Sequence, residues 1–109
     1  MPGIHNLHEY IEALRASFDA ERAGETRAVV QYIFTGAVTG ACYVIVADGA
    51  IQVAEGRHPA PTVAVTTDFD LWRQIIGYHL DPLMAYQDGL FTVEGDMETL
   101  LESDTWFRR

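Results

Sequence analysis

The spacing of the apolar residues changes twice along this chain, and these changes restrict the fold more than any other feature. In residues 6–20 the apolar side chains recur at helical spacing and form one stripe, which consists of Leu7, Tyr10, Ile11, Leu14 and Phe18. Residues 27–66 contain short runs of β-branched and aromatic residues, which are typical of strands. From residue 67 the helical spacing returns. This order predicts an α+β fold.

The predicted strands are short and are separated by turn residues. Asp48-Gly49 lies between two apolar runs and is a strong hairpin signal. Residues 56–61 form a loop, because the two prolines there cannot serve a central strand. We expect a five-stranded, largely antiparallel sheet covered by helices, with strands at 27–35, 40–47, 50–55, 62–66 and 90–94.

Three helices are predicted after residue 67, at 68–79, 82–88 and 97–103. Thr67 and Asp70 have the spacing of a capping box for the first of these helices. Its apolar residues spread over more than half of the circumference, which predicts a helix covered on two sides. In Asp81-Pro82 the aspartate is a candidate N-cap, followed by proline at the first helical position. Asn6 and Asp96 are the candidate N-caps of the helical segment at 6–20 and of the helix at 97–103.

Length and charge limit the classes of function. The 109 residues are enough for one domain, spanning 1–109. Sixteen acidic residues against seven basic ones give a formal net charge of −9, which argues against nucleic-acid binding and against electrostatic attachment to anionic lipids. The N-terminus has no signal-peptide pattern, and the longest apolar run, 41–47, is too short to span a bilayer. We expect a cytoplasmic protein without stable membrane insertion.

The sequence contains no recognisable motif for catalysis or for metal binding. Nucleotide-binding glycine loops and nucleophile elbows are absent from the sequence. His5 and His8 lack the spacing of a zinc helix and an indicated third ligand. Cys42, the single cysteine, fits a small buried side chain on a strand. We therefore expect no catalytic residue, no metal and no cofactor.

The second half of the chain carries a surplus of large apolar residues. Ordinary core packing explains such a surplus, and so does an apolar cavity or tunnel for a hydrophobic ligand. Methionine on a cavity wall would tolerate ligands of varied shape. The candidate ligand-binding residues are Phe69, Trp72, Ile75, Ile76, Leu83, Met84, Tyr86, Phe91, Met97, Leu100, Leu101 and Trp106.

The stretch LDPLMAYQDGLFTVEGDM at 80–97 resembles the sterol carrier protein type 2 lipid-binding domain family. Before it, a strand ends in a threonine–aspartate helix cap and an apolar helix follows, as in that family. The order of the predicted elements is similar over the rest of the chain. The positions that match the family pattern are Leu80, Asp81, Pro82, Ala85, Tyr86, Gly89, Val93, Gly95, Asp96 and Met97.

The resemblance implies an apolar tunnel enclosed by the sheet and helices. It also implies a non-enzymatic protein that binds, and carries, a fatty acid, acyl-CoA, sterol, isoprenoid or phospholipid. Trp106 and Phe107 would be candidate plugs of that tunnel. Two alternatives remain open: an interaction or dimerisation module with a vestigial cavity, and a small enzyme on a hydrophobic substrate that uses His79 or Asp81.

Overall fold

The computed structural model describes residues 4–76 and 80–108, and its framework is a five-stranded sheet. The strand order across the sheet is β3-β2-β1-β4-β5. Neighbouring strands are antiparallel except for β1 and β4, which are parallel. The predicted largely antiparallel sheet is therefore confirmed, with β1 at Ala28–Thr35, β2 at Gly40–Ala47, β3 at Ala50–Glu55, β4 at Val63–Asp68 and β5 at Thr92–Gly95.

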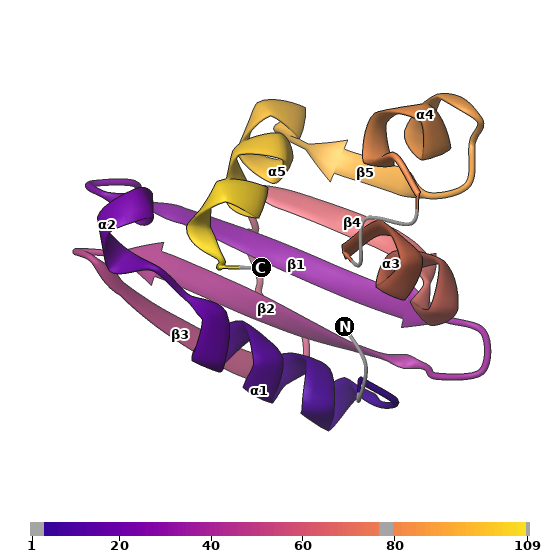
Figure 1. The fold of residues 1–109 in the computed structure, drawn as a ribbon, viewed down its shortest axis with the longest axis horizontal. Helices are drawn as coiled ribbons and strands as arrows, with labels where there is room; N and C mark the ends of the chain where they lie inside the picture. The colour runs from indigo at the N-terminus through magenta and orange to yellow at the C-terminus, as the bar shows by residue number, and fades with distance from the viewer. Residues whose placement is uncertain (1–3, 77–79, 109) are drawn as a thin grey trace.

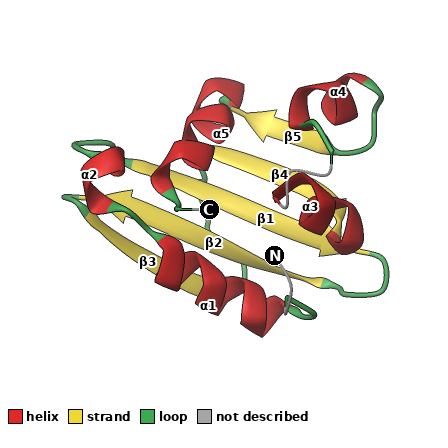
Figure 2. Cartoon of the chain, viewed as in Figure 1, coloured by secondary structure: helices red, strands yellow, loops and turns green. Residues whose placement is uncertain are grey.

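The helices gather over one face of this sheet (Figure 1). Helix α1 crosses β2 and β3, α5 lies over β1 and β4, and α4 lies beside the β5 end of the sheet (Figure 2). None of the helices in the described residues is long and apolar enough to cross a membrane. The helices are α1 at Leu7–Ser17, α2 at Ala20–Ala23, α3 at Phe69–Ile76, α4 at Pro82–Gln87 and α5 at Met97–Ser103, followed by the 3-10 helix η1 at Asp104–Trp106.

The two faces of the sheet differ in burial. The face under the helices carries the fully buried valines of the core, among them Val30, Val44 and Val65. On the opposite face, Val29 and Ile45 are direct cross-strand partners and are only half-buried. Because side chains alternate between faces along a strand, this one-sided burial leaves an apolar stripe on the helix-free face.

The connection from β3 to β4 covers part of that second face. Within it, the backbone N–H of His58 donates to Oε1 of Gln31 at 2.7 Å, and its ring meets Tyr43 edge-on at 5.2 Å. His58 Nδ1 also accepts a hydrogen bond from the N–H of Ala60 at 3.0 Å. His58 thus holds the loop between β3 and β4 on this face of the sheet.

Helix boundaries follow the expected caps with two corrections. The N-cap at Asn6 and the aspartate caps of α4 and α5 form as predicted. However, β4 continues through Asp68, so α3 begins at Phe69 and Oδ1 of Asp68, not a capping box, accepts the N–H of Leu71 at 3.1 Å. The predicted end of this helix, at 77–79, lies outside the described residues.

The second correction concerns the helix predicted over 6–20, which is split after Ser17. Phe18 is extended and pairs with Phe107 in an isolated bridge, so the chain turns before Asp19 caps the short helix α2. The C-terminal segment is the reason for this break, because it docks where a continuous helix would run. Tertiary pairing here overrides the local apolar period.

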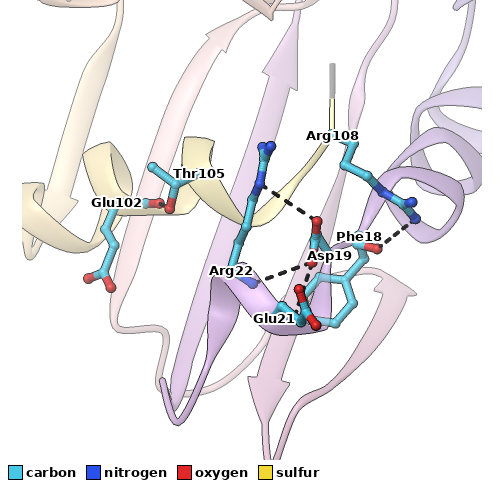
Figure 3. Close-up of polar contacts among 7 residues, drawn as sticks. All are labelled: Phe18, Asp19, Glu21, Arg22, Glu102, Thr105 and Arg108. Carbon is cyan, nitrogen blue, oxygen red and sulfur yellow. Dashed lines mark hydrogen bonds and ion pairs between the residues drawn. The ribbon is translucent and has the colours of Figure 1, made fainter.

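Several bonds hold the C-terminal segment against the α1–α2 junction. The N–H of Asp19 donates to the carbonyl of Trp106 at 2.7 Å, and the N–H of Arg108 donates to that of Ser17 at 2.6 Å. The Arg108 guanidinium also reaches the carbonyl of Phe18 at 3.3 Å (Figure 3). These contacts place η1 beside the helices that cover the sheet.

Candidate functional site

A cavity of about 210 Å³ lies on the helix-covered side of the sheet. Its wall combines residues from α1, β1, α3, α4 and α5 with one residue before β5, one on η1 and one after η1. Most of these side chains are apolar. The lining residues are Tyr10, Tyr32, Trp72, Ile75, Ile76, Pro82, Leu83, Tyr86, Phe91, Met97, Leu100, Leu101, Ser103, Asp104 and Phe107.

Buried aromatic rings form the floor of the cavity. Trp72 Nε1 donates to the hydroxyl of Tyr10 at 2.9 Å, which satisfies the indole in an apolar environment. The Tyr32 ring lies 5.5 Å from that of Tyr10 and 5.9 Å from that of Trp72, and Phe91 meets Trp72 edge-on at 5.8 Å. The Tyr10–Tyr32 and Trp72–Phe91 contacts are edge-to-face and the Tyr32–Trp72 contact is tilted, so the four rings pack together as a continuous aromatic floor.

The mouth consists of lining residues that are also exposed: Pro82, Leu83, Tyr86, Leu101 and Asp104. Three of them stand on α4, a helix without any charged residue. Ala85 is the single described residue of α4 that is buried, at 1% exposure. The helix is therefore attached through one small side chain, and its larger apolar side chains face the cavity or solvent.

Local sequence signals position α4 at the mouth. Asp81 Oδ1 accepts the N–H of Leu83 at 2.8 Å and that of Met84 at 3.2 Å, and Pro82 occupies the first helical position. Gly89 has φ +75°, a conformation that favours glycine at a helix C-terminus. Local sequence signals thus determine both the start and the end of α4.

Nine of the twelve candidate ligand-binding residues line this cavity. They come from α3, α4, α5 and the segment before β5, which the fold brings together over β1 and β4. Whether they contact a ligand remains a prediction. The nine are Trp72, Ile75, Ile76, Leu83, Tyr86, Phe91, Met97, Leu100 and Leu101.

The other three candidates lie elsewhere. Phe69 packs edge-on against Phe34 at 5.0 Å, behind the floor of the cavity. Met84, on the same short helix as Leu83, is 62% exposed and is not among the lining residues. Trp106, the last residue of η1, is fully buried and also outside the lining, and its Nε1 has no hydrogen-bond partner among the described residues. The apolar helical spacing of these three residues is the same as that of the lining residues, so the sequence could not distinguish them.

Six lining residues were not on the candidate list: Tyr10, Tyr32, Pro82, Ser103, Asp104 and Phe107. Tyr10 and Tyr32 belong to the first half of the chain, where no apolar surplus drew attention. Both are tyrosines at positions that face the core, and a buried tyrosine hydroxyl requires a polar partner. That requirement was the signal in the sequence that could have marked these two positions as special. Phe107, which the sequence suggests as a plug of the tunnel, lines the cavity.

Cys42 and Asp81, two other residues with reactive side chains, have structural roles. Burial, and to a smaller extent the charge of Glu55, raises the pKa of the Cys42 thiol to about 12, so the thiol is un-ionised at neutral pH. No group of three potential metal ligands occurs in residues 4–76 and 80–108. Asp81 is engaged as a helix cap, and His79 lies outside the described residues.

The size of the cavity limits what it holds in this conformation. An apolar cavity of about 150 Å³ accommodates a benzene ring, and the present cavity of about 210 Å³ is moderately larger. A long acyl chain or a sterol would therefore have to extend through the mouth or displace part of the wall. Helix α4, with its single buried residue, is the wall element with the least packing to lose.

Comparison with solved structures finds the same fold in other proteins. Sterol Carrier Protein 2 Like 2 from Aedes aegypti gives a TM-score of 0.70 at 21% identity, over 89% of this chain and 89% of that chain. A solution structure of palmitated SCP2L2 from the same organism gives 0.65 at 24% identity, over 89% and 86%. Identities this low establish the fold alone.

The chain also resembles a small part of a much longer enzyme. The stereoselective inverting sec-alkylsulfatase Pisa1 from Pseudomonas sp. gives a TM-score of 0.83 at 19% identity, over 92% of this chain. This chain spans only 16% of the length of that sulfatase.

Sequence comparison identifies the family. A search of curated proteins finds no significant match. The family model described as the SCP-2 sterol transfer family matches residues 9–108, which is nearly the whole chain. With the five-stranded sheet and the neighbouring solved structures in agreement, the chain belongs to the SCP-2 sterol transfer family.

Proposed function

We propose that this protein binds a hydrophobic ligand in the cavity between α3, α4 and α5 and carries it as a non-enzymatic, cytoplasmic lipid carrier. The observation that carries the proposal is an apolar cavity that opens to the surface between exposed leucines. Membership in the SCP-2 sterol transfer family supports lipid binding or transfer. The palmitated state named for the Aedes aegypti relative is consistent with an acyl chain as ligand.

Burial of apolar surface would supply most of the affinity. At about 25 cal/mol per Å², an acyl segment that loses a few hundred Å² of exposed surface gains several kcal/mol. One methylene group changes this energy by only about 0.8 kcal/mol. We therefore expect the protein to accept ligands of several chain lengths, with little discrimination between neighbouring homologues.

Two leucines with equal exposure provide a matched test. Leu101 is 47% exposed and lines the cavity, whereas Leu90 is 48% exposed and does not. A carboxylate at the mouth would have to be desolvated by an entering chain. Leu101→Glu should therefore weaken uptake of the neutral dye Nile red roughly tenfold, measured by fluorescence titration. Leu90→Glu should stay within about twofold of the unchanged protein.

Native mass spectrometry of the purified protein, followed by solvent extraction, would identify a ligand that co-purifies. A bound fatty acid, alcohol, isoprenoid or phospholipid supports the proposal and narrows the ligand class. An apo mass combined with failure to take up Nile red would rule out a carrier. If Leu101→Glu and Leu90→Glu lost Nile red affinity equally, this cavity would not be the binding site.

A second candidate function is a docking module, for a dimer or for an enzyme. The half-buried pair Val29 and Ile45 on the helix-free face of the sheet favours this alternative. The fold match to a small part of an alkylsulfatase is also compatible with an accessory domain. Sedimentation that depends on protein concentration, is lost in Ile45→Gln, and occurs without ligand uptake would support it.

A further inference from the structure

Large apolar side chains stay exposed on the two helices beside the mouth of the cavity. Helices α4 and α5 both contribute to the lining, and they lie on the same side of the sheet (Figure 1). We call their exposed apolar residues the mouth patch, which consists of Leu83, Met84, Tyr86 and Leu101. An exposed group of apolar side chains at the opening of a cavity is typical of a surface that another molecule covers.

Carboxylates flank both parts of the mouth patch. Asp88 follows Met84 by four positions on α4, and Glu98 precedes Leu101 by three positions on α5. Residues at these spacings are neighbours on a helix surface. Asp88 and Glu98 are exposed, and in the part of the chain that the structure describes neither carboxylate forms an ion pair. The mouth patch therefore has an acidic rim.

Positive charge is absent from this part of the sequence. Residues 74–103 contain six carboxylates and no arginine or lysine. Arg73, which immediately precedes this range, is paired with Asp70 at 3.3 Å. The apolar centre and the acidic rim of the mouth patch thus require a covering surface that supplies both apolar contact and positive charge.

A lipid bilayer and a second copy of this chain do not meet this requirement. Helices that bind in a bilayer interface carry lysine and arginine on their polar face, whereas α4 has no charged residue and α5 has acidic ones alone. A second copy would bring the same acidic rim, and the net charge of −9 on each chain adds repulsion. A protein surface with an apolar centre and a basic rim is complementary in both respects.

We propose that the mouth patch is the docking surface for a partner protein that presents an apolar centre surrounded by arginine or lysine. The ligand passes between the two proteins through the covered mouth. This inference rests on the proposed ligand-binding function and adds the route of transfer, because docking at the mouth keeps a hydrophobic ligand out of water. Opposite charges on the two rims accelerate the encounter and orient it.

The test uses a synthetic amphipathic helical peptide with leucine on one face and lysine on the other, which has the chemistry of the proposed partner. Fluorescence anisotropy of the labelled peptide measures its affinity for the purified protein. The peptide should bind, and an increase in salt from about 50 mM to about 500 mM should weaken binding roughly tenfold. A control peptide with glutamate in place of lysine should not bind.

Two matched pairs of variants locate the binding surface. Met84→Gln changes an apolar side chain of the mouth patch outside the cavity lining and should weaken peptide binding about fivefold, with Nile red uptake unchanged. Ile45→Gln, on the helix-free face of the sheet, should stay within about twofold. Circular dichroism verifies that each variant is folded.

The second pair tests the acidic rim. Glu98 and Glu21 are both exposed and both stand in the first turn of a helix, on α5 and α2 respectively. Glu98→Gln should weaken peptide binding about threefold at low salt, and Glu21→Gln should leave it unchanged. Equal effects of the two substitutions would mean that net charge, and not the rim, attracts the peptide, which would overturn the docking surface.

Further outcomes separate this inference from the function on which it rests. If Nile red binds but the leucine–lysine peptide does not bind at about 1 mM, or Met84→Gln and Ile45→Gln lose equally, the docking surface is overturned and the carrier function stands. Co-sedimentation with phosphatidylcholine vesicles, or self-association, that is lost in Met84→Gln would assign the patch to a membrane or to a second copy and overturn the proposed partner. Failure to bind Nile red would overturn the carrier function and the inference together.

Discussion

Gly95 illustrates how one residue determines the edge of the sheet beside the cavity. Its φ is +100°, and a Cβ atom built there would lie 2.4 Å from the carbonyl oxygen of Thr62 and 3.0 Å from Cα of Val63. The next residue, Asp96, donates its N–H to that same Thr62 carbonyl at 3.1 Å. Only a residue without a side chain allows β5 to approach β4 this closely and then turn into α5.

Gly95→Ala should lower the free energy of unfolding by roughly 3 kcal/mol, because steric overlap with the β4 backbone adds to the strain of a positive φ. Gly56→Ala is the matched control, since Gly56 has φ +108° but no atom within 4 Å of an added Cβ. It should cost only about 1–2 kcal/mol. Urea unfolding measures both. Equal losses would mean that backbone strain, and not the contact with Thr62, makes glycine necessary.

Helix α4 is stabilised more by the residues at its two ends than by packing against the core. With one buried residue it gains little from the core, and an isolated helix of this length is not stable in water. The N-cap at Asp81 and the left-handed conformation of Gly89 therefore determine where this helix begins and ends. Such a weakly packed wall can move aside for a ligand that exceeds the cavity volume.

Asp81→Ala should increase hydrogen exchange of the α4 backbone amides about fivefold, which corresponds to about 1 kcal/mol for a lost N-cap. Asp88 stands at the opposite end of the same helix, where a negative charge opposes the helix dipole. Asp88→Ala should therefore leave the exchange unchanged or slow it. Native-state hydrogen exchange provides the comparison, and faster exchange in both variants would refute the capping argument.

At the scale of the whole molecule, the C-terminal segment closes the structure against its N-terminal part. The Phe18 and Phe107 rings lie 6.1 Å apart, and the backbones of the two residues form a bridge. Phe107 also lines the cavity. Residues nearly ninety positions apart in the sequence are thereby joined beside the candidate site, so Phe107 both closes the fold and forms part of the cavity wall.

Phe107→Ala should lower the free energy of unfolding by about 3–5 kcal/mol, the cost of deleting a buried aromatic side chain. Arg108→Ala removes an exposed group with one long hydrogen bond of 3.3 Å and should cost less than about 1 kcal/mol. Denaturant unfolding followed by tryptophan fluorescence measures both. A small loss in Phe107→Ala would mean that the C-terminal segment is not coupled to the rest of the fold.

Much of the fold was predictable because its signals are local. The Asp48-Gly49 hairpin, the Asn6 cap and the Asp81-Pro82 helix start depend on residues a few positions apart, and all three form as expected. The split after Ser17 was not predictable, because it depends on Phe107. Nor could the extension of β4 through Asp68 be foreseen, since its pairing partner is Thr35 on β1.

The sequence by itself determined the α+β order of elements, the aspartate caps of α4 and α5, and the family through the 80–97 stretch. Only the tertiary structure decided which apolar residues enclose empty space. Helical spacing indicates which face of a helix is buried, but it does not distinguish a core residue from a residue of the cavity wall. Phe69 and Trp72 are both buried on α3, and only Trp72 lines the cavity. A cavity depends on distances between elements that are remote in sequence, which is why Tyr10, Tyr32 and Asp104 emerged only once the chain was folded.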